Sequence, residues 1–506
     1  MAAKTLMIQG TTSGAGKSVL ATALCRILKQ DGFRVAPFKS QNMALNSFVT
    51  GDGGEMGRAQ VVQAEAAGLE PHVDMNPILL KPEANARCQV VVLGRPAMTL
   101  KAGEYGRQAD KLLKVVTESL DRLRSAYDIV VIEGAGSPAE INIKENEIVN
   151  MRIAKLAEAP VLLVGDIDKG GVFASLVGTL TLLDETERNY IKGFVINKFR
   201  GDISLLQPGL DQLEKLTSRP VIGVIPYFHN IFIPQEDSVF LGEAAQAGNT
   251  DNTINIAVIH LPHLSNSTDF EPLQQETGVA VRFVKTAAEL QQPDVIILPG
   301  TKSTIADLNY LWQSGLAESI IQKARSGTPV AGICGGFQML GKEIKDPYGV
   351  ESKEGGIAGL GLLDTVTIFQ SQKTTRQVKA RVLSNDGLLE GLSGEEVIGY
   401  EIHMGQTAGN DIRPLFLVTQ KKGGKADYFD GVVAADGSAF GSYLHGLFDN
   451  ANFRYAFLSK LRQRKGLSEA PQPTVASQQQ QYDELADLVR SCLNLKLIYQ
   501  ICGLKV

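Results

Sequence analysis

Short apolar runs that alternate with helical patterns are the feature that most constrains the fold of this chain. In the first series of runs, several members are apolar throughout, as expected of strands buried on both faces of a parallel sheet. Residues 20–30 and 109–124, which lie between such runs, show helical spacing. The alternation predicts a doubly wound α/β domain over residues 1–235. The expected strands are residues 5–9, 34–37, 128–133, 160–165, 193–197 and 221–225.

A second series of the same kind begins after an interruption at residues 236–253, which we interpret as a linker. This series predicts another doubly wound α/β domain over residues 254–450. The remaining residues, 451–506, form an extension with a Pro/Gln/Ser-rich stretch and one amphipathic helix at about 482–501. The strands expected in the second domain are residues 254–259, 279–284, 295–298 and 329–333, followed by β-like runs at 362–368, 396–400 and 440–443.

Composition excludes several classes of protein. The chain has 506 residues, of which 44% are hydrophobic and 21% charged, so disorder is excluded as the main state. The net charge of -5 argues against a nucleic-acid binder held by bulk charge. Five scattered cysteines with no CxxC pair favour a reducing compartment, and neither a signal peptide nor an apolar membrane span is evident. We therefore expect a cytoplasmic protein with no membrane and no nucleic-acid partner.

The first expected strand runs into a Gly/Ser/Thr-rich loop that ends in Gly-Lys-Ser and is followed by a helical pattern. At such a junction, backbone N–H groups and the helix N-terminus can hold phosphates. Lys17 would reach the β- and γ-phosphates, and Ser18 would bind Mg²⁺. The spacing departs by one residue from the usual P-loop, since Gly10 lies six positions before Gly16. The residues expected to bind ATP are Gly10, Thr11, Gly14, Gly16, Lys17 and Ser18.

This departure resembles the P-loop of the dethiobiotin synthetase family, whose members activate a carboxylate by phosphorylation. The resemblance implies that Lys39, at the end of the second strand, is a catalytic lysine. It also implies that Glu133, in the turn Ile-Glu-Gly-Ala-Gly after a buried strand, binds metal together with Ser18. A solvated strand end is the alternative for Glu133.

Four further polar positions have weaker signals. Asp52 and Glu55 lie in a glycine-rich segment and are secondary metal candidates, with a polar turn as the equal alternative. Asn197 and Lys198 follow a strand, where they would meet an adenine ring or simply mark the exit of the chain from the strand.

The second domain contains a G-x-C-x-G sequence around Cys334, placed between an apolar strand and a helix. This arrangement is typical of a nucleophile elbow, in which a sharp turn between small neighbours presents the reactive side chain. The N-terminus of the following helix favours the thiolate form. A buried structural cysteine is the alternative interpretation.

The elbow resembles the triad-class glutamine amidotransferases, in which a cysteine attacks the side-chain amide of glutamine. The resemblance implies that His445 is the base, and that Gly300 and Gly335 contribute to the oxyanion or glutamine site. The class usually has a glutamate two residues after the histidine, but Leu447 occupies that position here. The orienting acid is therefore missing or supplied elsewhere. Asp449 is close in sequence, yet we favour a Cys–His dyad over a triad that includes it.

Five histidines remain besides His445. His403 would line the binding site for glutamine or for the acceptor, and a structural role is equally favoured. For His260 and His263, which flank a Leu-Pro pair after a strand, the structural interpretation is favoured, and His72 and His229 have no functional signal.

The two motifs together predict an ATP-dependent amidase, because a carboxylate must be activated before ammonia can displace an oxygen from it. Residues 37–47, 53–60 and 75–82, with the sequences GICGGFQMLG, GYEIHMGQT and SYLHGLF, resemble the cobyric acid synthase family over nearly the whole chain. A departure lies at residues 84–88, where a serine is expected before Gln89.

This family amidates the b, d, e and g carboxylates of adenosyl-cobyrinic acid a,c-diamide, which gives adenosyl-cobyric acid for cobalamin. The resemblance implies glutamine, ATP and a corrinoid as substrates, Mg²⁺ as the metal, and no tightly bound organic cofactor. It also implies that ammonia passes internally from Cys334 to the first domain. The oligomeric state stays open.

Two alternatives remain. Cobyrinic acid a,c-diamide synthases share both domains, but the KSQNMALNS segment argues against them. A P-loop ATPase switch with an inactive glutaminase-like domain is opposed by the presence of both Cys334 and His445.

Overall fold

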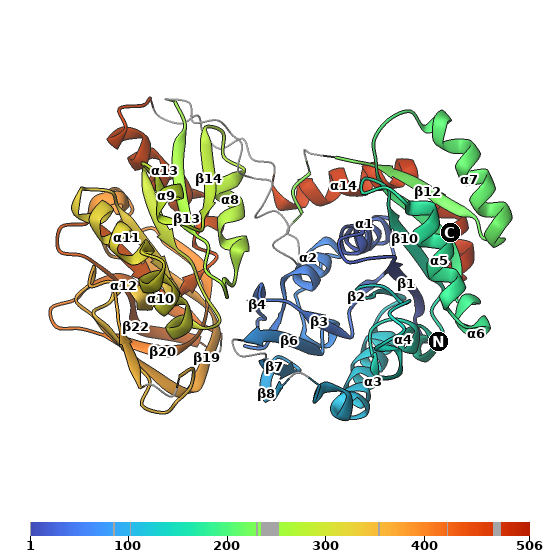
Figure 1. Ribbon diagram of the computed structural model, residues 1–506, viewed down its shortest axis with the longest axis horizontal. Helices are drawn as coiled ribbons and strands as arrows, with labels where there is room; N and C mark the ends of the chain where they lie inside the picture. The colour runs from blue at the N-terminus through green and yellow to red at the C-terminus, as the bar shows by residue number, and fades with distance from the viewer. Residues whose placement is uncertain are drawn as a thin grey trace.

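The computed structural model describes most of the chain, and Figure 1 shows its two bodies side by side. The described residues are 2–83, 87–101, 103–228, 231–233, 252–352, 355–422, 424–468 and 477–505. Most of the linker expected at 236–253, the departure at residues 84–86 and most of the Pro/Gln/Ser-rich stretch lie outside these ranges. In the described ranges, no helix is long and apolar enough to cross a membrane.

The first body contains a six-stranded parallel sheet in the order β12-β11-β10-β1-β9-β2, which confirms the six predicted strands. Successive residues of β9 face opposite sides: Val130 and Ile132 join one core, whereas Ile129 and Val131 join the other. Both faces are therefore buried, as the apolar runs predicted. The strands are β1 (Lys4–Gly10), β2 (Val35–Phe38), β9 (Ile129–Glu133), β10 (Val161–Asp166), β11 (Ile191–Phe199) and β12 (Val221–Pro226).

Helices cover this sheet on both faces, in the doubly wound arrangement. Helix α1 contributes to one core, and helices α3, α4 and α5 contribute to the other. The helices of this body are α1 (Lys17–Gln30), α2 (Arg58–Ala66), α3 (Ala109–Ala126), α4 (Met151–Ala157), α5 (Val172–Leu182), α6 (Glu185–Arg188) and α7 (Ile203–Thr217).

Between β2 and α3 the chain forms two small sheets that the sequence analysis did not predict. One has the order β3-β6-β7-β8, and the other is the hairpin β4-β5. Strand β4 contacts strands β19 (Val366–Val382) and β20 (Glu396–Ala408) of the second body. The insertion therefore forms part of the domain junction (Figure 1). Its strands are β3 (Gln41–Met43), β4 (Ser47–Val49), β5 (Glu55–Gly57), β6 (Ile78–Glu83), β7 (Arg87–Val92) and β8 (Arg95–Lys101).

The second body is built on one twelve-stranded sheet. Its parallel part has the order β14-β13-β15-β16-β23, as expected of an α/β domain, and the sheet continues through β22, β21 and β19 as an antiparallel extension. The remaining strands are β13 (Ile254–Ile259), β14 (Val279–Val284), β15 (Val295–Leu298), β16 (Val330–Ile333), β17 (Glu343–Lys345), β18 (Gly356–Ala358), β21 (Arg413–Lys421), β22 (Gly424–Val433), β23 (Ala439–Ser442) and β24 (Leu444–His445).

The sequence analysis missed most of this antiparallel extension. It predicted only fragments of β19 and β20, and neither β21 nor β22. Strand β19 contains the polar sequence QSQKTTRQ, and most of its residues are only partly buried. Because such strands lack a continuous apolar run, their hydrophobicity pattern is weak.

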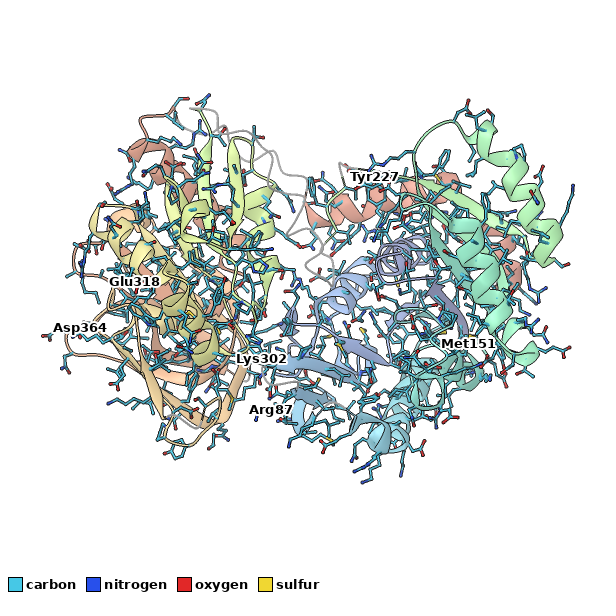
Figure 2. All side chains as sticks on the ribbon, viewed as in Figure 1. Arg87, Met151, Tyr227, Lys302, Glu318 and Asp364 are labelled. Carbon is cyan, nitrogen blue, oxygen red and sulfur yellow. The ribbon has the colours of Figure 1, made fainter. Side chains whose placement is uncertain are left out.

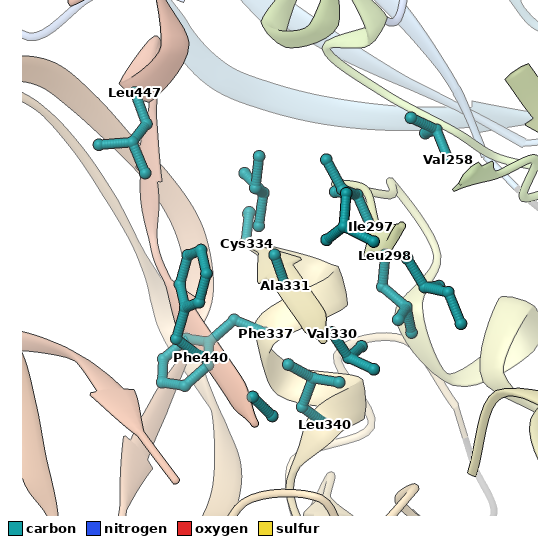
Figure 3. Packing of buried hydrophobic residues seen from close by; sticks show 14 of the residues in the cluster. Val258, Ile297, Leu298, Val330, Ala331, Cys334, Phe337, Leu340, Phe440 and Leu447 are labelled. Atoms are coloured by element: carbon teal, nitrogen blue, oxygen red, sulfur yellow. The ribbon is translucent and has the colours of Figure 1, made fainter. Parts of the chain in front are cut away.

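Close packing holds the helix after β16 against the sheet (Figure 3). A Cβ atom on Gly336 would lie 2.0 Å from the carbonyl oxygen of Leu298, so only glycine allows this approach. Phe337 and Leu340 point from this helix into the core, where Phe440 also lies. The helices of this body are α8 (Glu271–Gln274), α9 (Ala287–Leu290), α10 (Thr304–Gln313), α11 (Leu316–Arg325), α12 (Gly335–Leu340) and α13 (Ala451–Arg464).

The C-terminal segment returns to the first body, where it contributes to the same core as α1. The single helix predicted at 482–501 is in fact two helices, α14 (Gln478–Cys492) and α15 (Leu495–Cys502). The break arises because Leu493 forms an antiparallel bridge with Gly223, and the Asn494 N–H donates to the Ile222 carbonyl oxygen at 2.9 Å. Arg26 on α1 binds Asp483 on α14 through two hydrogen bonds of 2.7 and 2.8 Å.

If α14 is part of the first body's core, Leu485→Ala should lower the free energy of unfolding by about 2–5 kcal/mol, because the substitution leaves a cavity. Urea unfolding followed by far-UV circular dichroism measures this change. The exposed neighbour Glu484 is the control, and Glu484→Ala should alter the value by no more than about 0.5 kcal/mol. Equal effects of the two substitutions would contradict this packing.

Candidate functional sites

The predicted phosphate loop lies between β1 and α1, at the carboxyl edge of the parallel sheet. Gly14 and Gly16 have φ angles of 73° and 98°, which favour glycine. A Cβ atom on Gly16 would also lie 2.0 Å from the side-chain nitrogen of Asn197. The Lys17 ammonium donates to the carbonyl oxygens of Thr12 at 3.0 Å and Gly136 at 3.1 Å.

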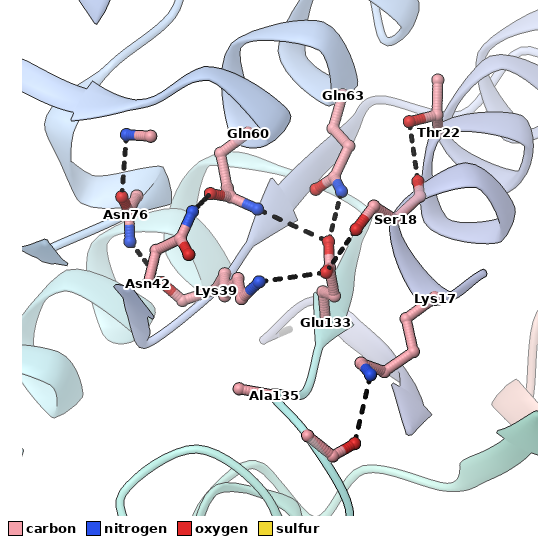
Figure 4. A network of polar contacts seen from close by, with 12 residues as sticks. Lys17, Ser18, Thr22, Lys39, Asn42, Gln60, Gln63, Asn76, Glu133 and Ala135 are labelled. Carbon is pink, nitrogen blue, oxygen red and sulfur yellow. Dashed lines mark hydrogen bonds and ion pairs between the residues drawn. The ribbon is translucent and has the colours of Figure 1, made fainter. Parts of the chain in front are cut away.

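Glu133 is the centre of a buried polar network beside this loop (Figure 4). Its carboxylate accepts hydrogen bonds from the Ser18 hydroxyl at 2.8 Å and from the Gln63 amide at 2.5 Å. The Lys39 ammonium lies 3.1 Å from the same carboxylate. Burial would raise the pKa of Glu133, but Lys39 and these hydrogen bonds outweigh it, so the pKa is lowered.

The structure thus brings together Ser18, Lys39 and Glu133, which the sequence placed far apart. A serine hydroxyl and an ionised carboxylate are oxygen ligands that suit Mg²⁺, which usually takes few ligands from the protein. In the described part of the chain, no cluster of three or more His, Cys, Asp or Glu side chains forms a ready-made metal cage.

The weaker candidates of the first body separate into two groups. Asn197 and Lys198 contact the phosphate loop, because they donate to the carbonyl oxygens of Ala15 at 2.9 Å and Gly14 at 2.8 Å. Asp52 instead accepts from Thr50 within its own turn. Glu55 is paired with lysines at the domain junction and lies outside the network of Glu133.

Cys334 occupies a strained turn between β16 and α12. Its φ of 51° is rare for a residue with a side chain and agrees with the predicted elbow. The neighbouring glycine is required, since a Cβ atom on Gly335 would lie 2.7 Å from the Thr301 side chain. Gly300 packs beside the histidine, since an added Cβ atom would lie 3.1 Å from His445 Cε1. Three of the predicted residues, Cys334, His445 and Gly335, therefore line one pocket, and Gly300 lies next to it behind His445.

An aspartate orients the histidine. The Nδ1 atom of His445 lies 2.7 Å from the Asp269 carboxylate, which also accepts the Gly446 N–H at 3.0 Å. Both side chains are buried, with 1% and 3% exposure. Burial favours the neutral imidazole, but Asp269 and Cys334 raise the pKa of His445 to about 10. The geometry is therefore that of a Cys–His–Asp triad, and the expected dyad is corrected.

Asp269 was missed because it comes from a distant part of the sequence, in the polar stretch SNSTD that follows β13. The only available signal was its position after a buried strand, at the edge where parallel strands place their sites. Leu447, at the position of the usual glutamate, is buried in the core. Asp449 is nearby, but in the described residues it makes no hydrogen bond to His445.

Two of the other histidines have structural partners, and His229 lies outside the described residues. His403 stacks on Tyr443 at 3.7 Å between ring centroids and hydrogen-bonds the Gly405 carbonyl oxygen at 2.8 Å. Burial lowers its pKa to about 3, so it lines the pocket as a neutral ring. His263 pairs with the Asp307 carboxylate at 2.7 Å.

The first body contacts the second directly at the loop that carries Asp269. Asn266 donates to the carbonyl oxygen of Ser47 at 2.9 Å and to the Tyr400 hydroxyl at 2.7 Å. The Ser267 N–H donates to the Asn46 side chain at 2.9 Å. The ring of Tyr400 stacks on His445, with 5.2 Å between centroids. Part of the wall around His445 therefore depends on a loop of the first body.

Each of the two bodies matches a known protein family. Residues 6–238 match the CobQ/CobB/MinD/ParA nucleotide binding domain, and residues 255–453 match the CobB/CobQ-like glutamine amidotransferase domain. The cobyric acid synthase of Dehalococcoides mccartyi (strain CBDB1) is 57% identical over 500 residues, which cover 99% of each chain. That of Sorangium cellulosum is 52% identical over 517 residues, with 100% of this chain and 99% of the relative covered. That of Pelotomaculum thermopropionicum is 51% identical over 512 residues, with 99% and 97% covered.

If Asp269 maintains the charge of His445, Asp269→Asn should lower the pKa of the imidazole from about 10, because Cys334 alone then opposes the effect of burial. Titration of the histidine ring signals by NMR measures this shift. The rate at which iodoacetamide alkylates Cys334 at pH 7 should fall roughly ten- to hundredfold, because the variant loses one hydrogen bond to a charged group and its free energy corresponds to that factor. Asp449→Asn is the matched control and should leave both readouts near their original values. A similar response of the two variants would contradict the triad.

Proposed function

The chain belongs to the cobyric acid synthase family, and from this premise we propose that it converts adenosyl-cobyrinic acid a,c-diamide to adenosyl-cobyric acid in cobalamin biosynthesis. The reaction amidates the b, d, e and g carboxylates with ATP and glutamine. The observation that carries the proposal is the full-length match to the cobyric acid synthase of Dehalococcoides mccartyi. The aligned region covers 99% of the chain at 57% identity, and it includes both sites. The five free cysteines are in keeping with a cytoplasmic location.

At the second site, the Cys334 thiolate attacks the side-chain amide carbon of glutamine. Backbone N–H groups near Gly300 and Gly335 stabilise the oxyanion that forms. The C–N bond then breaks, and His445 gives its proton to the departing nitrogen, which leaves as ammonia. The neutral His445 then takes a proton from a water molecule, whose oxygen attacks the γ-glutamyl thioester; the C–S bond breaks and releases glutamate and the thiolate. Asp269 holds the imidazole in the orientation that both proton transfers need.

At the first site, a carboxylate oxygen of the corrinoid attacks the γ-phosphorus of ATP, and ADP leaves. Lys17 at the phosphate loop and Lys39 beside Glu133 would stabilise the charge that develops on the transferred group. Ser18 and Glu133 would hold Mg²⁺, which when bound neutralises phosphate charge. Ammonia from the second site attacks the carbonyl carbon of the acyl phosphate. The amide forms and phosphate is released.

Mass spectrometry of the corrinoid tests this assignment. The wild type, with glutamine, ATP and Mg²⁺, should replace hydroxyl by amino at each of the four carboxylates. Cys334→Ala should lose glutamine-dependent amidation by a factor of roughly 10³ or more but retain amidation with ammonium, because ammonia then enters without the thioester.

Lys17→Met is the matched control, and it should lose amidation with either nitrogen source. If the wild type leaves adenosyl-cobyrinic acid a,c-diamide unchanged, the proposed substrate is wrong. Loss of ammonium-dependent amidation in a folded Cys334→Ala variant would contradict the separation into two sites.

A further inference from the structure

The turn between β23 and β24 connects the nucleophile of the second site to its base. Strand β23 ends at Ser442, and His445 follows three residues later in β24. The carbonyl oxygen of Ser442 accepts the backbone N–H of Cys334 at 2.8 Å. Ser442 therefore contacts the backbone of the nucleophile and also begins the turn that carries the base.

A buried carboxylate from the neighbouring strand holds this turn. The Ser442 hydroxyl accepts the Leu444 N–H at 2.9 Å and donates to the carboxylate of Asp430 on β22. The same carboxylate accepts the Tyr443 N–H at 3.3 Å. All four residues are buried, so these hydrogen bonds form in a medium of low dielectric, where they are stronger than in water. Asp430 thus binds the turn at two successive residues just before His445.

Carboxylates consequently fix the backbone on both sides of His445. After the histidine, the Gly446 N–H donates to Asp269 at 3.0 Å, and Asp269 also binds the imidazole ring. Before the histidine, Asp430 and Ser442 hold the backbone of the turn. Two anchors on opposite sides of one residue leave its backbone little freedom. Asp269 therefore orients a ring whose point of attachment is already set.

The environment of Asp430 is unfavourable for a charged carboxylate. Burial and the neighbouring Glu401 raise the pKa of Asp430 to about 7, although its hydrogen bonds with Ser442 and Tyr443 oppose this rise. A side chain without an acceptor would avoid the buried charge, but it would leave the Ser442 hydroxyl and the Tyr443 N–H without this partner. We therefore interpret the turn as the feature that this carboxylate serves.

We propose that Asp430 is a positioning residue for glutamine hydrolysis, which acts through Ser442 to hold the His445 imidazole against the Cys334 thiolate. The assignment rests on the proposed glutaminase function and adds a second acid to it. The two acids have different tasks: Asp269 binds the imidazole ring, whereas Asp430 sets the backbone from which that ring projects.

The contacts of Asp430 are separate from the junction between the two bodies. Its hydrogen-bond partners in the turn belong to the second body. The junction is marked in Figure 2 by Lys302, which binds Glu83 of the first body at 2.9 Å. We therefore expect a substitution of Asp430 to affect the second site and to leave the first site unchanged.

Simple stabilisation of the turn is the competing explanation, and kinetic constants separate it from positioning. Asp430→Leu removes both acceptor oxygens, whereas Asp430→Asn keeps one of them. The matched control is Asp436→Leu, because Asp436 accepts the N–H and the hydroxyl of Ser438 at 2.9 and 2.6 Å, just before β23 begins. Release of glutamate from glutamine gives kcat and KM for each variant, and far-UV circular dichroism verifies that it is folded.

In Asp430→Leu, kcat should fall roughly 10- to 100-fold while KM stays within about twofold of the wild-type value, because a small displacement of the base affects the chemical step more than binding. The pH at which the alkylation of Cys334 by iodoacetamide rises should move upward, since the thiolate loses part of its contact with the imidazolium. Asp430→Asn should recover most of kcat. Asp436→Leu should match the wild type in both readouts, although it removes a similar pair of hydrogen bonds.

A folded Asp430→Leu variant that is less stable but keeps the wild-type kcat and alkylation profile would overturn the assignment. If Asp430→Leu does not fold, Ser442→Ala breaks the same contact, and the presence or absence of the same losses then decides. Ammonium-dependent amidation of the corrinoid is measured in parallel and should be unchanged in every variant. If the wild type amidates with ammonium but releases no glutamate from glutamine, the proposed glutaminase function fails instead, so the two failures are distinguishable.

Discussion

The contact between Asn266 and the backbone of Ser47 is the interaction on which the two-site architecture depends. It joins a loop of the first body to the loop that carries Asp269, three residues further along the chain. Asp269 in turn orients His445, whose ring is stacked on Tyr400. Because Tyr400 also donates to the carbonyl oxygen of Ser47 at 3.1 Å, separation of the bodies would disturb both neighbours of the histidine at once. The second site is therefore complete only when the first body is docked.

The same inserted segment of the first body reaches both sites. It begins at Lys39, whose ammonium binds Glu133 beside the phosphate loop. It continues through Ser47 to Glu55, a buried carboxylate that pairs with Lys373 of the second body. Lys81 of the first body binds the same carboxylate, so Glu55 is the centre of a buried charge cluster that spans the junction. A continuous stretch of chain thus links the phosphate loop of the first body to the pocket of Cys334 in the second.

Local signals explain which parts of this account could be predicted from the sequence. Apolar runs identify the buried parallel strands, and glycine-rich turns identify the loop of Lys17 and the elbow of Cys334. These features can be predicted because each is formed by residues that are adjacent in the sequence. Asp269 carries no such signal, since its partner is 176 residues away. The antiparallel strands β19 and β22 mix buried with partly buried and exposed residues, so they lack a continuous apolar run. The break between α14 and α15 depends on a bridge to Gly223, a tertiary contact that helical periodicity does not reveal.

A double-label experiment tests the central claim, that nitrogen released at Cys334 displaces an oxygen that ATP has activated in the first body. Wild-type protein is supplied with ATP, glutamine labelled with ¹⁵N in its side-chain amide, corrinoid labelled with ¹⁸O in its carboxylates, and unlabelled ammonium in the medium. Mass spectrometry of both products should find one ¹⁵N in the corrinoid and one ¹⁸O in inorganic phosphate for every amide formed. Phosphate without ¹⁸O would contradict the acyl phosphate, and dilution of ¹⁵N by the ammonium would contradict internal passage between the two sites.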